Sequence, residues 1–365
     1  MTADAYGGVW TYALELADAL AGRGDVVQLA TMGRPPSPGQ RRQLEASAVA
    51  SVHESRFALE WMPDPWEDVT DAGHWLLELA DELRPDVVHL NGYCHGALEW
   101  PAPAVVVAHS CVLSWWWSVR RREPPRDTEP YRARVRAGLA GADAVVAPSR
   151  WMLDQLDRWY GQRDGTVIPN CRRPRGGRPP KEPFVLGAGR LWDEAKNLDL
   201  LERVAPRLRW PVFLAGDDAA PGTGAAHGAG ACSGAAGQKG AAVRLGLLDE
   251  ASVAAWLGRA SVFAAPARYE PFGLAILEAA LSRCALVLGD IPSLREIWGG
   301  AAVFVDPDDE DGWAATLERV CADGAETERL GAAARRRARA YEPQACARSY
   351  ARLYATLSTR VGSLP

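Results

Sequence analysis

Residues 268–278 read Arg-Tyr-Glu-Pro-Phe-Gly-Leu-Ala-Ile-Leu-Glu, so that seven residues separate two carboxylates, Glu270 and Glu278. The apolar segment 260–265 just upstream has the length of a strand, and Pro266 stops it. Downstream, leucines recur at three- and four-residue spacing, as on the core-facing side of a helix: Leu274, Leu277 and Leu281. The stretch therefore predicts a strand, a loop and a helix in that order.

The predicted helix start has the features of an anion site. Gly273 would let a ligand approach the first backbone N–H groups of the helix, those of Phe272, Gly273 and Leu274. These groups and the helix dipole favour negative charge. Because helical side chains lean toward the N-terminus, Glu278 would point back to the same place. A phosphate-binding helix start beside a carboxylate that accepts from hydroxyls predicts a nucleotide-sugar site. The alternative is an ordinary strand–turn–helix with two surface glutamates.

The setting Glu-Pro-Phe-Gly-Leu-x-x-Leu-Glu-Ala at residues 270–279 resembles the signature of the retaining glycosyltransferases of family 4 (glycosyl transferases group 1). This resemblance implies the two-domain GT-B fold. It also implies that Glu278 binds the ribose hydroxyls of the donor and that Glu270 contacts the transferred sugar. The backbone amides of residues 272–274 would bind the pyrophosphate.

Size and composition narrow the class of protein. A chain of 365 residues with 48% hydrophobic residues is long enough for two domains with substantial cores. The net charge of −5 argues against general nucleic-acid binding, and no apolar run is long enough to span a bilayer. The seven cysteines include no C-x-x-C pair, so a disulfide framework is not expected. We expect a cytoplasmic protein, with peripheral contact at the inner face of the membrane left open.

Strand-like and helix-like segments alternate along the chain, which predicts an α/β protein with parallel sheets and helices on both faces. Residues 171–183 are rich in proline, glycine and arginine and offer little to bury, as in a domain linker. The GT-B resemblance implies two doubly wound Rossmann-like domains that face a cleft. The expected divisions are an acceptor-side domain at 1–172, a linker at 173–183, a nucleotide-sugar-binding domain at 184–342, and a helix at 343–365 that returns to the first domain.

Residues 4–9 read Asp-Ala-Tyr-Gly-Gly-Val, and the pair Gly7-Gly8 suits a tight turn that a diphosphate or a sugar can approach closely. The resemblance implies the family's N-terminal glycine loop, and a plain helix-capping turn is the alternative. Only Met1-Thr2-Ala3 precede the loop, where relatives have a longer apolar strand. We therefore expect a shortened central strand and reduced stability.

Two cations follow the predicted strand 184–189. The resemblance implies that Arg190 and Lys196 neutralise the donor pyrophosphate, since the leaving group is a nucleoside diphosphate and fixed positive charge stabilises it. Such cations would make a divalent metal unnecessary, and the chain has no D-x-D motif. We therefore expect no cofactor and no metal. Two solvated surface cations are the alternative.

His109 follows the apolar strand 104–108, and active-site residues of open α/β sheets collect at such strand ends. The resemblance implies that His109 contacts the donor sugar, whereas a lone strand-end histidine is more often a packed residue. Where relatives often have His-x-His, this chain has His89 and Asn91. A metal site is a further alternative, although the spacing fits no strong template: His89, Cys94, His95 and His109.

Three tryptophans and three arginines follow His109, at residues 115–117 and 120–122. Aromatic rings beside a basic cluster could stack on a sugar acceptor or dock on an anionic membrane. A packed helix with a solvated basic end is equally consistent with the pattern.

Together these patterns predict a retaining, metal-independent hexosyltransferase that uses a nucleotide-diphosphate sugar and a glycan or lipid-linked acceptor. His109 and Glu270 are the expected catalytic residues. The expected donor-binding residues are Gly7, Gly8, Arg190, Lys196, Phe272, Gly273, Leu274 and Glu278. The alternatives are a GT-B nucleotide-sugar epimerase and a non-catalytic sugar-binding relative.

Overall fold

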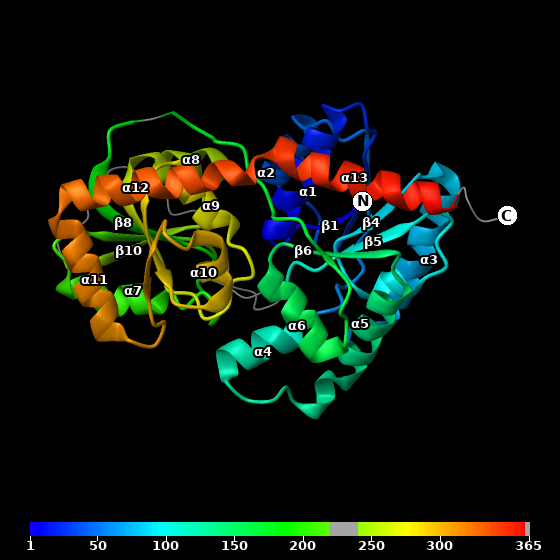
Figure 1. Cartoon of the computed structure of the whole chain (residues 1–365), viewed down its shortest axis with the longest axis horizontal. Helices are drawn as coiled ribbons and strands as arrows, with labels where there is room; N and C mark the ends of the chain where they lie inside the picture. Colours follow the sequence, from blue (N-terminus) through cyan, green and yellow to red (C-terminus); the bar gives the residue numbers. More distant parts are fainter. Residues whose placement is uncertain (178, 219–239, 362–365) are drawn as a thin grey trace. The chain divides into compact units, whose positions relative to one another are not determined.

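The computed structural model describes residues 1–177, 179–218 and 240–361, and the chain divides into two compact units (Figure 1). The first unit contains residues 1–173 and 341–365, and the second contains residues 174–340. The strands of each unit pair only in parallel.

The strands of the first unit form two hydrogen-bonded groups, ordered β1-β2-β3 and β4-β5-β6-β7. The strands are β1 (Thr2–Asp4), β2 (Gln28–Met32), β3 (Ser51–Glu54), β4 (Val88–Leu90), β5 (Ala104–Val107), β6 (Ala144–Ala147) and β7 (Thr166–Val167). Asn91 joins the two groups, because its backbone N–H donates to Thr2 Oγ1 (2.8 Å) and its Nδ2 donates to the Thr2 carbonyl (2.6 Å). The central strand β1 thus lies beside β4, although β1 has only three residues.

Helices connect these strands and pack on the sheet. They are α1 (Gly8–Ala21), α2 (Pro38–Glu45), α3 (Trp66–Leu83), α4 (Val112–Arg120), α5 (Glu129–Gly141), α6 (Arg150–Tyr160) and α13 (Pro343–Val361). Ser149 begins α6 as its N-cap, where its side chain accepts from the backbone N–H of Met152. The valines of β5 are almost fully buried, as expected for a strand with both faces covered.

The second unit has one six-stranded parallel sheet, ordered β10-β9-β8-β11-β12-β13. Its strands are β8 (Glu182–Ala188), β9 (Val212–Ala215), β10 (Ala242–Gly246), β11 (Ala260–Ala265), β12 (Ala285–Gly289) and β13 (Val303–Val305). Numbered from the first strand of this unit, the order is 3-2-1-4-5-6, which is typical of a doubly wound sheet. The strand order reverses between the first and the fourth strand. The reversal therefore lies between β8 and β11.

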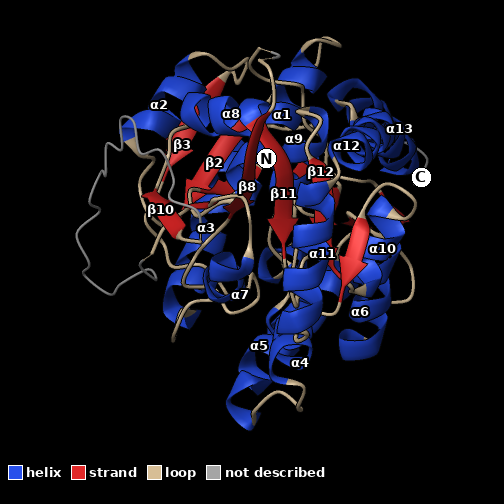
Figure 2. Ribbon diagram, turned by 90° about the vertical axis from the view of Figure 1, so that its left-hand side faces the viewer, coloured by secondary structure: helices blue, strands red, loops and turns tan. Residues whose placement is uncertain are grey.

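Helices cover both faces of this sheet, with α8 and α12 on one side and α7 on the other (Figures 1 and 2). The helices are α7 (Asp199–Val204), α8 (Glu250–Arg259), α9 (Leu274–Leu281), α10 (Pro292–Trp298), α11 (Glu310–Ala322) and α12 (Gly324–Ala338). The predicted α/β class with parallel sheets is confirmed.

The last helix packs on the first unit, as the resemblance implied. Tyr12 of α1 donates through Oη to Tyr350 Oη of α13 (2.6 Å), and both side chains are fully buried. Beside them, Arg172 forms a buried ion pair with Glu15 of α1, with Nη1 and Oε1 2.9 Å apart. The backbone N–H of Arg172 also donates to the Tyr341 carbonyl (3.2 Å). The segments that leave and re-enter the first unit are therefore held together.

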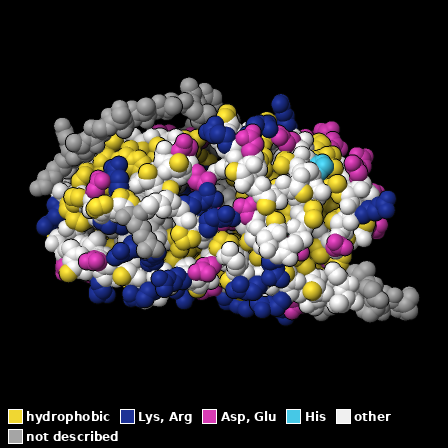
Figure 3. Space-filling model, turned by 90° about the horizontal axis from the view of Figure 1, so that it is seen from above, with side chains coloured by type: hydrophobic (Ala, Val, Ile, Leu, Met, Phe, Trp, Pro, Cys, Tyr) yellow, Lys and Arg dark blue, Asp and Glu magenta, His cyan; other side chains and the backbone are white. Residues whose placement is uncertain are grey.

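Exposed ion pairs contribute less to the stability of the folded chain than the buried Arg172–Glu15 pair does. On the face shown in Figure 3, basic, acidic and hydrophobic side chains are interspersed. Exposed ion pairs such as Arg41 with Glu54 add little, because water and salt screen their charges. Within the described residues, no helix is long and apolar enough to cross a membrane.

Replacing Glu15 by alanine should lower the free energy of unfolding of the first unit by about 3–5 kcal/mol, because the change leaves the Arg172 guanidinium buried without its carboxylate. Urea unfolding, followed by a probe in the first unit, measures the change. Glu54→Ala removes an exposed partner and should lower the free energy of unfolding far less. Equal losses in the two variants would contradict the importance assigned to the buried pair.

Candidate functional site

In a doubly wound sheet, ligands bind beyond the carboxyl ends of the strands, where the strand order reverses. In the second unit this place is formed by residues 189–198 after β8 and residues 266–273 after β11. These two loops contain all of the residues that the sequence predicted for the second unit except Leu274 and Glu278, which lie on α9.

Hydrogen bonds join the two loops directly. The backbone N–H of Arg268 donates to the Ala195 carbonyl (2.8 Å). Asn197 Nδ2 donates to the Pro266 carbonyl (3.1 Å) and the Pro307 carbonyl (2.9 Å). Asn197 is 1% exposed and has a left-handed backbone with φ of 52°. A buried side chain that ties three loops together sets the spacing between the groups on either side of it.

The structure brings Lys196 and Glu270 together. Lys196 Nζ lies 2.6 Å from Glu270 Oε2, and the two side chains are 22% and 18% exposed. The Ser293 hydroxyl, on α10, donates to the Glu270 carbonyl (2.7 Å) and fixes the backbone of that residue. A half-buried lysine and carboxylate thus sit where the strand order reverses, within reach of solvent.

Arg190 lies in the same loop as Lys196 and interacts with Asp193. Arg190 Nε is 3.1 Å from Asp193 Oδ2, and the guanidinium carbon lies 5.3 Å from the centre of the Trp192 ring. Burial alone would raise the pKa of Asp193, but the charges of Arg190 and Lys196 and the hydrogen bonds from Ala195 and Arg190 lower it overall. The ionised Asp193 therefore orients Arg190, whose side chain is 47% exposed.

The predicted helix start is confirmed as the start of α9, with Gly273 as its N-cap. Gly273 has φ of 88°, and a Cβ there would lie 2.7 Å from Ile276 Cδ1 and 3.3 Å from Glu270 Cγ. The left-handed backbone at this position favours glycine, and a Cβ would in addition crowd the Ile276 and Glu270 side chains. Phe272 is buried, and Glu278 lies half-buried one turn beyond Leu274.

In the first unit, Gly7 and Gly8 follow β1 and are both exposed. Gly7 has φ of 155° and ψ of −127°, and helix α1 begins at Gly8. A Cβ built at Gly7 would meet no atom within 4 Å. The backbone of this turn is thus accessible from outside.

His109 follows β5 and is held by Asn91, which follows the neighbouring strand β4. His109 Nε2 lies 2.9 Å from Asn91 Oδ1. Because Asn91 Nδ2 donates to the Thr2 carbonyl, Oδ1 is the acceptor, and Nε2 of His109 must carry the hydrogen. Nδ1 of His109 is then left as a hydrogen-bond acceptor.

A buried polar chain continues from Asn91 to the C-terminal helix. His89 Nε2 lies 3.2 Å from the same Asn91 Oδ1, and His89 Nδ1 lies 2.6 Å from Tyr354 Oη of α13. Burial lowers the pKa of His109 to about 3. Burial, with the charges of the chain's amino group and His109, lowers the pKa of His89 to about 3. Both imidazoles are therefore neutral at neutral pH.

The alternative metal site does not form in the described residues, where no three His, Cys, Asp or Glu side chains are grouped to hold an ion. His95, one of the four candidates, is buried with its Nε2 3.0 Å from the Val69 carbonyl. His89 and His109 instead share Asn91 Oδ1 as their hydrogen-bond partner.

Arginines cover much of the tryptophan cluster of α4. The guanidinium carbon of Arg120 lies 5.8 Å from the ring centres of both Trp115 and Trp116. Arg158 of α6 lies 4.1 Å from the ring centre of Trp117, which also packs on the core. For Trp117 the packed-helix alternative holds, and the predicted roles in acceptor or membrane binding stay untested.

Sequence reasoning missed three residues that shape the site: Asp193, Asn197 and Ser293. An acidic residue three positions after a strand-end cation was a usable signal for Asp193. Asn197 and Ser293 act on carbonyls far away in the chain, so no local pattern could identify them.

Comparison with known proteins identifies both halves of the chain. The family described as "Glycosyltransferase Family 4" matches residues 6–174, and the family "Glycosyl transferases group 1" matches residues 182–323. A glycogen synthase of Mycobacterium tuberculosis is 30% identical over 374 residues, covering 91% of this chain and 86% of that protein. A D-inositol 3-phosphate glycosyltransferase of Xylanimonas cellulosilytica is 27% identical, covering 98% and 94%.

Solved structures share the fold at lower identity. A sucrose-phosphate synthase from Thermosynechococcus elongatus superposes with a TM-score of 0.76 at 20% identity, over 97% of this chain and 94% of that one. Alr3699/HepE from Anabaena, solved with UDP and glucose, superposes with a TM-score of 0.72 at 15% identity, over 96% of each chain.

The two neutral histidines should make the first unit less stable in acid. In the unfolded chain histidine binds a proton near pH 6.5, whereas His89 and His109 in the folded chain do so only near pH 3. Stability is therefore complete above about pH 6.5 and falls toward pH 3, by about 1 kcal/mol per pH unit for each histidine.

Urea unfolding at pH 7.5 and pH 5.5 tests this expectation. His109→Asn removes one of the two titrating groups and should reduce the loss between the two pH values. His74→Asn, at an exposed position of α3, should leave the loss unchanged. A loss that is the same in wild type and His109→Asn would contradict the assignment.

Proposed function

The chain belongs to the family 4 (group 1) glycosyltransferases of the GT-B fold, and from this premise we propose that it transfers a hexose from a nucleotide-diphosphate sugar to a glycan acceptor, with retention of anomeric configuration. The observation that carries the proposal is the Lys196–Glu270 pair, 2.6 Å apart, beside the start of α9 where the strand order reverses. Solved structures of Alr3699/HepE with UDP and with UDP-glucose support a nucleotide-sugar donor.

The positive groups of this loop suit a diphosphate leaving group. Lys196 and Arg190 would bind its oxygens, and the backbone amides of residues 272–274 would add the dipole of α9. When the diphosphate binds, phosphate oxygens replace Glu270 as the partner of Lys196. Glu270 then accepts from the hydroxyls of the transferred sugar. These fixed cations compensate the developing charge, so we expect transfer to need no divalent metal.

Glu278 completes the donor site in this proposal. It lies one turn beyond the start of α9, where a carboxylate can accept from the two ribose hydroxyls while the backbone binds the phosphates. His109 and the Gly7-Gly8 turn, in the first unit, are proposed to contact the transferred sugar. The neutral His109 would accept a hydroxyl hydrogen at Nδ1.

Transfer with retention fits a front-face displacement. The bond between the anomeric carbon and the phosphate oxygen breaks, and the acceptor oxygen bonds to the same face of that carbon. The departing phosphate oxygen takes the acceptor's proton, so no carboxylate nucleophile is needed. The glycogen synthase relative makes an α-glucan such as maltohexaose the first acceptor to test.

Calorimetric titration with UDP, GDP and ADP in EDTA tests the donor site. We expect micromolar binding of one nucleotide by the wild type. Lys196→Ala and Glu278→Ala should each weaken it about tenfold or more, because each removes hydrogen bonds that involve a charged group. Arg207→Ala, an exposed cation paired with Asp311 in the same unit, is the control and should bind as wild type does.

Two results would overturn the proposal. Binding by Lys196→Ala and Glu278→Ala with wild-type affinity would remove the site assignment. Nucleotide release from the donor without any acceptor, or a product of inverted configuration by proton NMR, would remove the reaction assignment and favour an epimerase or another transferase class.

A further inference from the structure

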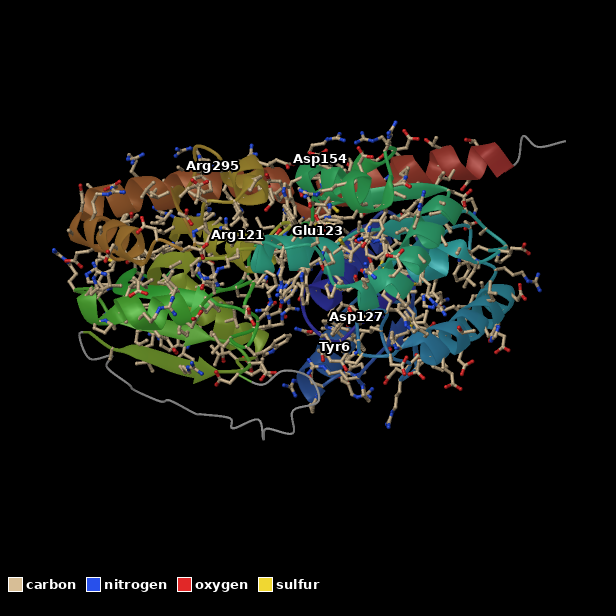
Figure 4. All side chains as sticks on the ribbon, turned by 90° about the horizontal axis from the view of Figure 1, so that it is seen from below. Tyr6, Arg121, Glu123, Asp127, Asp154 and Arg295 are labelled. Carbon is tan, nitrogen blue, oxygen red and sulfur yellow. The ribbon has the colours of Figure 1, made fainter. Side chains whose placement is uncertain are left out.

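An exposed tryptophan lies beside the glycine turn of the first unit. Trp61 is 44% exposed, one of three large hydrophobic side chains that the described residues leave exposed. Its ring meets the ring of Tyr6 edge to face, with ring centres 5.5 Å apart and planes at 85°. Tyr6 directly precedes Gly7 and is labelled in Figure 4. Contact between the apolar indole surface and water is unfavourable, so a ligand that covers the ring gains free energy on binding.

Neighbouring loops hold Tyr6 in place. The Arg34 guanidinium carbon lies 5.0 Å from the centre of the Tyr6 ring, and Arg34 Nε and Nη2 both donate to the Ala5 carbonyl (2.9 and 2.7 Å). Gly33 has φ of 82°, and a Cβ there would lie 2.7 Å from Tyr6 Cε2. The Tyr6 ring thus packs against the backbone after β2, and the two aromatic rings are already arranged without a ligand.

Hydrogen bonds connect the segment that contains Trp61 to the loop after β4, which contains Asn91, the partner of His109. Glu60, the neighbour of Trp61, accepts through its carboxylate from the backbone N–H groups of Tyr93 (3.0 Å) and Cys94 (2.8 Å). These residues follow Asn91, whose Oδ1 is bonded to His109. The exposed indole and the proposed catalytic histidine therefore share one loop framework at the carboxyl edge of the sheet.

We propose that Trp61 and Tyr6 form a stacking subsite for a sugar ring of a carbohydrate acceptor. A sugar ring presents C–H groups to an aromatic face and hydroxyls to polar neighbours, and Arg34 beside the Tyr6 ring is such a neighbour here. The acidic residues Glu60 and Asp64 on either side of Trp61 disfavour an anionic membrane as the occupant. The acceptor role rests on the proposed function, whereas sugar binding at this surface does not.

Proton–nitrogen NMR of the tryptophan indole groups in the full chain tests the subsite directly. The Trp61 signal is identified by its loss in Trp61→Phe. Maltohexaose or cellohexaose at millimolar concentration should shift it in a saturable way, while the Trp210 signal of the second unit stays in place. No shift with either sugar would overturn the proposal, and so would a shift seen only with phosphatidylglycerol vesicles.

Transfer kinetics supply the second readout. Trp61→Ala should raise the KM for an oligosaccharide acceptor about tenfold, with kcat and the KM for the donor unchanged, and Trp61→Phe should retain most of the affinity. Val26→Ala, which truncates another exposed hydrophobic residue of the same unit, is the control. An unchanged acceptor KM, or equal losses for donor and acceptor, would overturn the assignment. If no sugar is transferred at all, the proposed function fails, while the NMR titration still decides whether Trp61 binds sugar.

Discussion

All paired strands in both sheets run parallel, and the position of the functional groups depends on this shared direction. A parallel pair needs a crossover connection, so every loop at the carboxyl edge begins where a strand ends and a helix has yet to start. Residues far apart in the chain therefore meet at one edge. Lys196 and Glu270 are 74 positions apart and bonded, and Asn91 and His109 meet in the same way in the first unit.

Strands that are buried on both faces could be predicted from the sequence, whereas an exposed edge strand could not. β5 and β11 were evident as apolar runs because both of their faces are covered. The sequence reading missed β3, because Ser51, His53 and Glu54 give this four-residue edge strand no hydrophobic pattern. In the site, the motif around Glu270 was legible because a strand, a glycine and a helix follow one another locally. The bonds from Asn197 to two distant carbonyls have no local pattern, so they required the structure.

The polar groups at the carboxyl ends of the strands are neutral in the first unit and ionised in the second. In the first unit the chain from His109 through Asn91 and His89 to Tyr354 is neutral, because burial opposes protonation of both imidazoles. In the second unit the groups are ionised, with Asp193 against Arg190 and Glu270 against Lys196. A neutral edge suits contact with sugar hydroxyls, and a charged edge suits a diphosphate. The difference arises from the partners: Asp193 is buried but faces the charges of Arg190 and Lys196, whereas Lys196 and Glu270 are partly exposed to water.

The placement of α13 also bears on how the protein is made. Two segments of the chain that flank the second unit form the first unit, so Tyr350 and Tyr354, which bond to Tyr12 and His89, are synthesised after the whole of the second unit. The second unit is continuous in sequence and can complete its core before α13 emerges. Domains usually fold in the order of synthesis, but here the first unit can be completed only after the second unit has been synthesised. During that interval the apolar side of α1 that α13 covers is open to solvent and to chaperones.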